Sequence, residues 1–194
     1  LTETERVNAV IGVRSLQEED TYLVMVTRRG IIKRVALSAV SSIRPSGLII
    51  MNLKPDDELV EAQLATSEQD VILVSEQGMS IRFPVGETPL RLRAAGGVKG
   101  IRFRTEDRIV SMDIVDPDSR ILVISKNGYG KLTRLTAYRQ QRRGGVGIKT
   151  FNITSKTGLV AAAEVVDESK EVYVLSEKAQ VLRTNMSEIS NLSR

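Results

Sequence analysis

Short apolar runs recur along the chain at nearly even intervals. They read YLVMVT at 22–27, VILVS at 71–75, ILVIS at 121–125 and VYVLS at 172–176. Each run is rich in valine, isoleucine and leucine and is too short for a stable helix, which is typical of β-strands. A second apolar stretch follows each run across a short turn. The pattern therefore predicts four β-hairpins.

Glycines mark the turns of the first three hairpins. They are Gly30, Gly78 and Gly128, and Ala179 holds the equivalent place in the fourth. Glycine adopts left-handed backbone angles without the steric cost that other residues incur. We therefore expect the fourth turn to have either another geometry or some strain.

Two more families of apolar segments complete a repeat. One reads GLIIMNL, GGVKGIRF and GGVGIKTF, and the other contains valines spaced by fifty residues, namely Val60, Val110 and Val160. Four strands per repeat and a period near fifty residues are typical of propellers and related arrays. We expect an all-β, propeller-like array of four-stranded antiparallel blades with almost no helix. The approximate units are 5–53, 57–104, 107–153 and 158–194.

The composition narrows the possible functions. The 194 residues are 41% apolar, which is enough to bury a core, and they include no cysteine and no histidine. The usual thiolate and imidazole metal ligands and the commonest general base are therefore missing. No run of eighteen apolar residues is present, so no membrane span is expected. We predict a cytoplasmic chain that is not an enzyme by itself and needs no cofactor.

Basic residues gather in phase with the repeat. The third unit holds seven of them without an intervening acid: Lys126, Lys131, Arg134, Arg139, Arg142, Arg143 and Lys149. The second unit has Arg91, Arg93, Lys99, Arg102 and Arg104, and the first has Arg28, Arg29, Lys33, Arg34 and Arg44. Acids crowd the stretches before each apolar strand instead. We expect one basic rim and one acidic rim, and the basic rim suits the backbone of duplex DNA.

The stretch QRRGGVG, from Gln141 to Gly147, concentrates this chemistry. Two guanidinium groups stand beside glycines, which are expected to adopt turn conformations and to expose backbone N–H groups to an anion. By sequence, the stretch aligns with Pro45-Ser46-Gly47 and with Ala95-Gly96-Gly97. It is the most basic copy of a glycine-led element that every complete unit carries.

Aromatic residues are scarce, with three phenylalanines, four tyrosines and no tryptophan. A platform for stacking unpaired bases is poorly supplied, so duplex DNA is favoured over single strands. Tyr22 and Tyr173 are expected to pack inside strands, whereas Tyr129 and Tyr138 could pack or could flank the basic segment. The methionines predicted to fill the core are Met25, Met51, Met79 and Met112.

Over nearly its whole length, the chain resembles the C-terminal domain of DNA gyrase A. The segments that carry the resemblance are TYLVMVTRRGIIKRVALS, GMSIRFP, AAGGVKGIRF, NGYGK and QRRGGVG. The last is similar to the gyrase A box, which implies that Arg142 and Arg143 contact DNA phosphate. Val146 departs from the box, where a basic residue is usual. The family has six blades with the principal box in the first, so we expect that leading blades are absent here.

The resemblance implies a β-pinwheel whose rim bends and wraps double-stranded DNA, in support of ATP-dependent negative supercoiling. Strand cleavage and ATP hydrolysis would belong to the partners, the N-terminal cleavage domain of gyrase A and gyrase B, in the bacterial cytoplasm at the nucleoid. The open alternatives are the corresponding domain of topoisomerase IV, a protein-interaction propeller, and an enzyme using Tyr129 and Tyr138. The predicted DNA-binding residues are Gln141, Arg142, Arg143, Gly144, Gly145, Gly147, Lys149, Arg139, Arg134, Lys131, Arg91, Arg93, Lys99, Arg102, Arg44, Arg28, Arg29 and Lys33.

Overall fold

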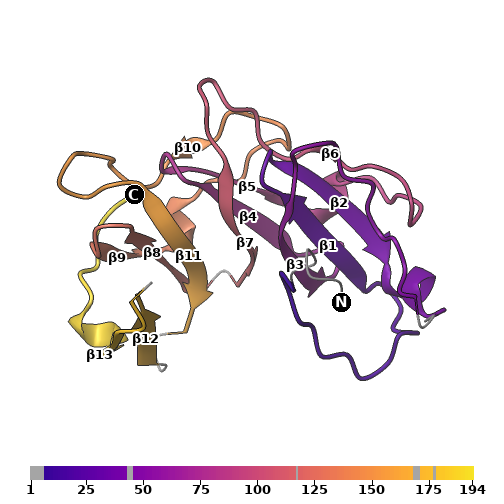
Figure 1. The fold of residues 1–194 in the computed structure, drawn as a ribbon, viewed down its shortest axis with the longest axis horizontal. Helices are drawn as coiled ribbons and strands as arrows, with labels where there is room; N and C mark the ends of the chain where they lie inside the picture. Colours follow the sequence, from indigo (N-terminus) through magenta and orange to yellow (C-terminus); the bar gives the residue numbers. More distant parts are fainter. Residues whose placement is uncertain (1–6, 43–45, 117, 168–170, 177) are drawn as a thin grey trace.

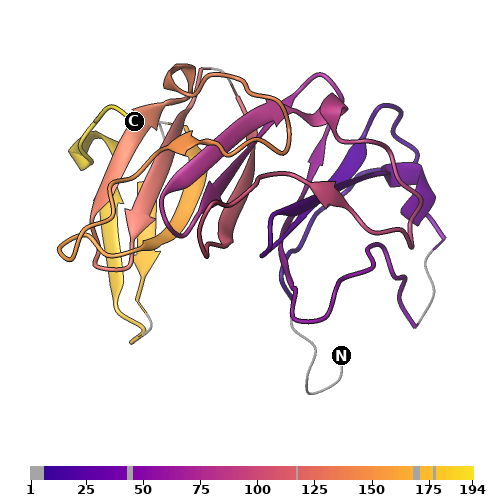
Figure 2. The same ribbon diagram turned by 90° about the horizontal axis from the view of Figure 1, so that it is seen from above.

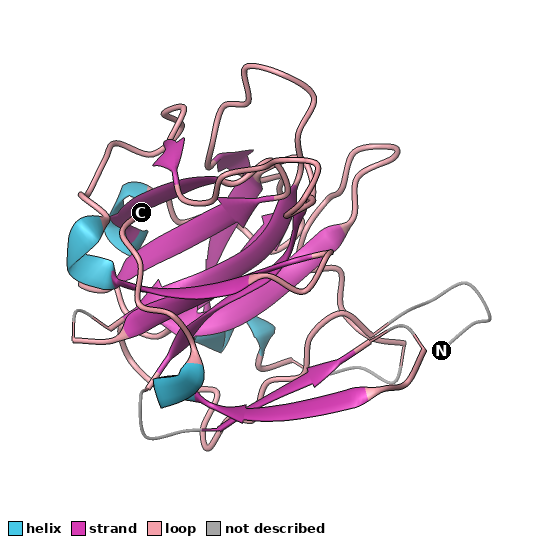
Figure 3. Ribbon diagram, turned by 90° about the vertical axis from the view of Figure 1, so that its left-hand side faces the viewer, coloured by secondary structure: helices cyan, strands magenta, loops and turns pink. Residues whose placement is uncertain are grey.

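Strands dominate the fold. The computed structural model of the chain describes residues 7–42, 46–116, 118–167, 171–176 and 178–194. Within these ranges it has thirteen β-strands in four antiparallel sheets and four short 3-10 helices (Figures 1 and 3). The same ranges contain no helix long and apolar enough to cross a membrane. The prediction of an all-β fold with very little helix is confirmed.

The first sheet is built around a hairpin of two buried strands. β1 (Tyr22–Thr27) pairs with β2 (Ile31–Ala36), and Gly30 makes the turn at φ +75°. Alternate residues of β1 enter two different hydrophobic clusters, so both faces of the strand are covered. β3 (Leu59–Ala65) pairs with β1 and β6 (Val98–Lys99) with β2, giving the order β3-β1-β2-β6.

The other sheets follow the same plan with fewer strands toward the C-terminus. The second has the order β10-β5-β4-β7, made of β4 (Asp70–Ser75), β5 (Met79–Pro84), β7 (Ile109–Val115) and β10 (Ile148–Lys149). The third, β11-β8-β9, contains β8 (Arg120–Ser125), β9 (Gly130–Arg134) and β11 (Val160–Val166). The fourth pairs β12 (Glu171–Leu175) with β13 (Val181–Asn185). A 3-10 helix follows each hairpin: η1 (Leu37–Val40), η2 (Val85–Glu87), η3 (Leu135–Ala137) and η4 (Met186–Glu188).

A sheet does not coincide with one sequence repeat. β3 and β6 complete the first sheet, although both come from the stretch predicted as the second unit. β7 and β10 complete the second sheet from the stretch predicted as the third unit. The hairpin of one repeat therefore lies between two strands of the next. Periodicity gives the spacing of equivalent strands but not their partners, so the sequence did not reveal this exchange.

The sheets follow one another along an arc (Figures 1 and 2). β7 contacts both β3 and β11, so these three edge strands lie together on the inner side of the arc. Val60, Val110 and Val160 all line one cavity of about 480 Å³ between them, which we call the hub. Their fifty-residue spacing thus marks equivalent positions around a common centre. β6 and β10 lie at the opposite edges of the first and second sheets.

The fourth turn keeps the geometry of the others without a glycine. Ala179 has φ +58° and donates its N–H to the Ser176 carbonyl at 2.9 Å, as Gly128 does to Ser125 at 3.0 Å. Of the two predicted outcomes, strain rather than another geometry is the correct one. A left-handed alanine costs on the order of 1 kcal/mol.

The side chains predicted to pack are mostly inside. Met25 and Met112 are buried, and Met51 and Met79 are half-buried. Tyr22 is half-buried with the Arg34 guanidinium 4.5 Å from its ring centre, whereas Tyr138 is buried and its hydroxyl lies 2.5 Å from the Thr150 Oγ1.

The prediction was wrong for Tyr173, which is 56% exposed. Its strand, β12, pairs only with β13, and no further strand of the described residues covers that hairpin.

Candidate nucleic-acid interface

Two long segments cross from one sheet to the edge of the preceding one, and they carry most of the predicted DNA-binding residues. We call residues 88–104 belt 1 and residues 138–152 belt 2. Belt 1 begins where Arg91 donates its N–H to the Arg34 carbonyl, and it includes β6. Belt 2 begins where Gln141 donates its N–H to the Arg82 carbonyl, and it includes β10. The belts therefore occupy equivalent places on the first and second sheets.

The contacts of the belts correct the alignment of QRRGGVG. Gly97 and Gly147 approach the same point of the sheet edge, because an added Cβ would lie 2.6 Å from the Ile32 carbonyl oxygen and 2.4 Å from that of Ser80. The spacing is thus fifty residues, so Gly97 matches Gly147 and not Gly145. The fifty-residue interval of the hub valines already contained this register.

The two belts meet at a junction that brings basic residues together. Gly144 donates its N–H to the Gly100 carbonyl at 2.7 Å, and Arg102 donates its N–H to the Gly145 carbonyl at 2.8 Å. These two bonds place Lys99 and Arg102 of belt 1 next to Arg142 of belt 2. All three side chains are exposed. The junction is the densest group of exposed cations that these contacts create.

The glycines of QRRGGVG serve close packing rather than anion binding. Gly144 has φ +77°, but its N–H is used by Gly100, and Gly145 donates its N–H to the Arg142 carbonyl at 3.2 Å. Gly145 does not have a positive φ. The expectation that these two residues expose free N–H groups was wrong, because the belts bond to themselves and to each other.

Arg143 is partly used by the protein. Its Nη1 donates to the Lys99 carbonyl at 2.6 Å and its Nε to the Glu87 carbonyl at 3.0 Å, while its backbone N–H donates to the Glu87 carboxylate at 2.8 Å. The side chain is half-buried. Arg143 therefore ties belt 2 to belt 1 and to the end of η2, unlike the exposed Arg142.

Two of the predicted DNA-binding lysines lie inside the protein. Lys33 is fully buried, and Lys131 is 9% exposed and donates from Nζ to the Ser193 carbonyl at 2.7 Å. Burial lowers the pKa of both amines below 10.5, and the nearby Arg91 lowers that of Lys33 further. Assigning these two residues to the DNA surface was a mistake. Alternation along β2 and β9 places them on an inward face, which a charge count cannot show.

The remaining predicted residues have varied positions. Arg28 lies at the hub, where its guanidinium pairs with Glu58 at 2.6 Å, so it is not part of the belts. Arg29 is exposed beside it, and Arg44 lies outside the described residues. Arg93 is half-buried in belt 1. The exposed members on or near the belts are Arg91, Arg134, Arg139 and Lys149.

Some of the acids that precede the strands have a structural use. The Asp57 Oδ1 accepts the N–H groups of Arg29 and Glu58 at 3.1 and 3.0 Å. The Asp107 Oδ1 accepts those of Gln77 and Arg108 at 3.0 and 2.8 Å. Each carboxylate thus fastens a hairpin turn to the start of an inner strand. Their clustering in the sequence reflects this repeated contact at least as much as an acidic rim.

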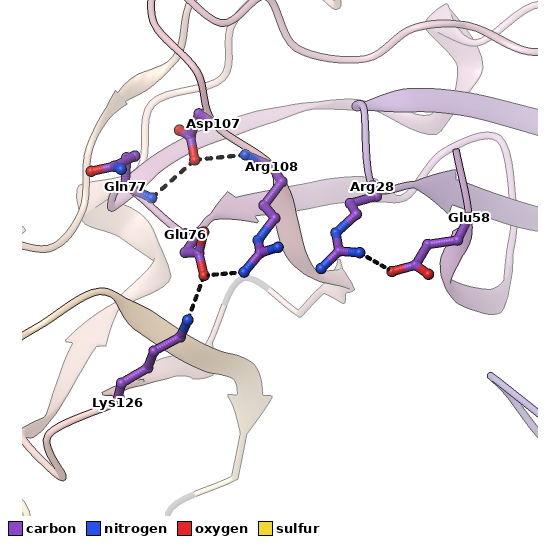
Figure 4. A network of polar contacts seen from close by, with 7 residues as sticks. All are labelled: Arg28, Glu58, Glu76, Gln77, Asp107, Arg108 and Lys126. Carbon is purple, nitrogen blue, oxygen red and sulfur yellow. Dashed lines mark hydrogen bonds and ion pairs between the residues drawn. The ribbon is translucent and has the colours of Figure 1, made fainter. Parts of the chain in front are cut away.

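The hub contains a charge network that the sequence did not reveal (Figure 4). Arg28, Glu76 and Lys126 each follow the Thr or Ser that ends the first strand of a hairpin. Glu76 is 8% exposed, and its Oε1 lies 2.7 Å from both Arg108 Nη2 and Lys126 Nζ. In the first sheet the signs are reversed, with Arg28 paired to Glu58. The repeated Thr/Ser-charge pattern was the available signal.

The hub network makes stability depend on pH in a defined direction. The hydrogen bond from Arg108 lowers the pKa of Glu76 below 4.5; burial opposes this shift and Lys126 adds to it. Because the folded pKa is depressed, the stabilisation is present above about pH 4.5 and is lost as the pH falls through the folded value. We expect Glu76→Gln to reduce the free energy of unfolding by about 1–2 kcal/mol at pH 7.

Urea denaturation at several pH values between 7 and 3 tests this expectation. The difference between wild type and Glu76→Gln should shrink below pH 4.5, while Glu68→Gln, an exposed control, should change little at any pH. A difference that stays constant down to pH 3 would show that the carboxylate charge is not its origin.

Comparison with known proteins agrees with this architecture. The family described as the DNA gyrase C-terminal domain, a β-propeller, matches residues 21–65, 69–116, 119–167 and 170–194. DNA gyrase A of Dehalogenimonas lykanthroporepellens is 41% identical over 184 residues, which are 95% of this chain and 22% of that protein. DNA gyrase A of Mycolicibacterium smegmatis is 40% identical over 192 residues, 98% of this chain and 23% of that protein. The chain thus spans less than a quarter of these relatives.

Two solved structures superpose on the whole chain. The C-terminal domain of a DNA topoisomerase IV matches with a TM-score of 0.92 at 25% identity and is covered to 61% of its length. A DNA gyrase A C-terminal domain matches with a TM-score of 0.86 at 26% identity and is covered to 64%. Together with the family match and the gyrase relatives, the exchanged hairpin sheets and QRRGGVG establish that the chain belongs to the DNA gyrase C-terminal domain family, the β-pinwheel domain of gyrase A.

Proposed function

We propose that this chain is a non-catalytic module that binds duplex DNA along its belts and bends it. The observation that carries the proposal is the belt junction, where Lys99 and Arg102 of one belt meet Arg142 of the other. Exposed cations that belong to two successive sheets give a polyanion a path across both. Phosphate contacts of this kind position a duplex without reading its sequence.

A duplex fits the belts better than other nucleic acids. The helices among the described residues have three or four residues each and cannot enter a major groove as a recognition helix. Tyr138 is buried, which removes one candidate for base stacking. Smooth bending of a short duplex costs roughly 1–6 kcal/mol, so several phosphate contacts are needed together.

In the parent protein, we propose that the bent duplex supports ATP-dependent negative supercoiling by a gyrase-like type II topoisomerase. The partners would be the cleavage domain of gyrase A and gyrase B, and the place would be the bacterial cytoplasm at the nucleoid. We assign no catalytic residue and no cofactor to this chain. Strand cleavage and ATP hydrolysis would belong to the partners.

The corresponding role in topoisomerase IV is the second candidate, favoured by the TM-score of 0.92 to that enzyme's domain. The sequence favours gyrase, because the gyrase relatives are 40 and 41% identical to the chain and the topoisomerase IV domain is 25% identical. Gyrase-like wrapping predicts that the chain constrains supercoils of one sign in relaxed circular DNA. A chain that binds DNA without constraining supercoils would support the second candidate.

Salt dependence of binding tests the proposed function. If about six phosphates are neutralised, log affinity for a linear duplex should fall with log salt at a slope of about −5. Affinity should differ little between duplexes of unrelated sequence, and end-to-end energy transfer should report bending. A flat salt response would contradict the proposal and would leave a protein-binding propeller as the better explanation.

A further inference from the structure

Lys33 is a buried cation whose partners are all backbone carbonyls. It lies in the middle of β2 and is 0% exposed. Its Nζ donates to the carbonyls of Arg93 at 2.6 Å, Ala95 at 2.7 Å and Ile50 at 2.7 Å. An ammonium has three N–H donors, so this arrangement satisfies all of them. No phosphate of a bound duplex could reach the ammonium without displacing the belt that covers it.

The three acceptors belong to two separate segments. Arg93 and Ala95 are in belt 1, whereas Ile50 is in the stretch before β3. The Ala95 carbonyl also accepts the Asn52 N–H at 3.4 Å. Lys33 therefore joins the first sheet to belt 1 and to the stretch beside it at one point. A buried amine without these carbonyls would be costly, so the contact fixes the belt as strongly as the belt fixes the lysine.

The equivalent positions of the other sheets support a role in holding belts. Pairing across the hairpins makes Lys33, Ile81 and Lys131 equivalent. Lys131 also donates to a backbone carbonyl, that of Ser193. Where the lysine is replaced by Ile81, belt 2 comes closer, with the Cβ position of Gly145 3.4 Å from Ile81 Cδ1. Belt 2 is held by Arg143 instead.

We infer that Lys33 is a positioning residue for the proposed DNA surface: its ammonium holds belt 1 so that Arg91, Lys99 and Arg102 are presented in order. The inference rests on the proposed function. It divides the cations of the belts into two kinds, those that contact phosphate and those that hold the backbone carrying them. Lys33 belongs to the second kind, and so does the side chain of Arg143.

The salt slope separates the two kinds. Removing a phosphate contact lowers the affinity and also reduces the slope by about one. Removing a holding cation lowers the affinity because the belt must be ordered again on binding, but the number of phosphates neutralised is unchanged. We therefore expect Lys33→Met to weaken duplex binding about fivefold with the slope preserved. Arg91→Ala should weaken binding and flatten the slope by about one.

The experiment compares wild type, Lys33→Met, Arg91→Ala and the exposed control Lys178→Met, each titrated with the same linear duplex at several salt concentrations. Amide hydrogen exchange of Asn52 and Ala95 is followed in the free proteins. Faster exchange in Lys33→Met together with a preserved slope supports the inference. Unchanged exchange, or a slope reduced as in Arg91→Ala, would overturn it.

Two further points keep the outcomes separate. If wild type does not bind duplex, the proposed function fails, and the exchange rates still decide whether Lys33 holds belt 1. If Lys33→Met does not fold, Arg143→Met takes its place, since that side chain is only half-buried. For Arg143→Met, weaker binding with a preserved slope supports a holding role, and a slope reduced by one overturns it.

Discussion

Replacing Gly147 with alanine should destabilise the protein by about 3 kcal/mol, more than most single substitutions. The residue has φ +77°, and a Cβ there would lie 2.4 Å from the Ser80 carbonyl oxygen and 3.0 Å from its carbon. The left-handed angle alone costs about 1–2 kcal/mol. The rest comes from backbone that must move, since Ser80 belongs to β5 and faces β10. The midpoint of thermal unfolding should fall by roughly 6–12 °C.

Gly128 offers a matched control, because only the backbone angle is the same. It has φ +80°, and an added Cβ would meet nothing within 4 Å. The fourth hairpin already has an alanine at the equivalent position, Ala179 at φ +58°. Gly128→Ala should therefore cost only about 1 kcal/mol. Equal losses for Gly147→Ala and Gly128→Ala in urea denaturation would show that the contact with β5 is not the cause.

The hairpins could be predicted because the information that forms them is local. An apolar run such as VILVS, a glycine at position 78 and a second apolar stretch together fix a strand, a turn and a partner strand. The exchange of strands could not be predicted in this way. β10 has two residues, and its pairing with β5 depends on contacts almost seventy residues away in the chain. No local pattern in Ile148 and Lys149 names Ser80 and Met79 as their partners.

The candidate site shows the same division between local and distant information. The sequence identified the basic stretches, and Arg142 and Arg102 are indeed exposed. Charge alone does not say whether a cation faces solvent, so Lys33 was grouped with them although it is buried under belt 1. Its place between Ile32 and Val35, both buried, was a hint of an inward position. The backbone contacts of Arg143 had no comparable hint, because they depend on where belt 1 lies.

The belt junction should dominate DNA binding. Arg102 and Arg142 come from different belts, and the bonds between Gly144 and Gly100 and between Arg102 and Gly145 bring them together. Each phosphate contact that releases a counterion contributes about 0.9 log units at 0.1 M salt. The double variant Arg102→Ala with Arg142→Ala should therefore bind a linear duplex about 50-fold more weakly at that salt concentration. The salt slope should fall from about −5 to about −3.

The matched control removes two exposed cations outside the belts, with Arg14→Ala and Lys178→Ala. Net charge changes by the same amount in both double variants, but charges farther than about 10 Å from the duplex are screened at 0.1 M salt. The control should lose about twofold or less and keep its slope. The backbone bonds of the junction do not involve the truncated side chains, so unfolding in urea should be nearly unchanged. If both double variants lose affinity equally, binding follows overall charge, and the place where the belts meet has no special role.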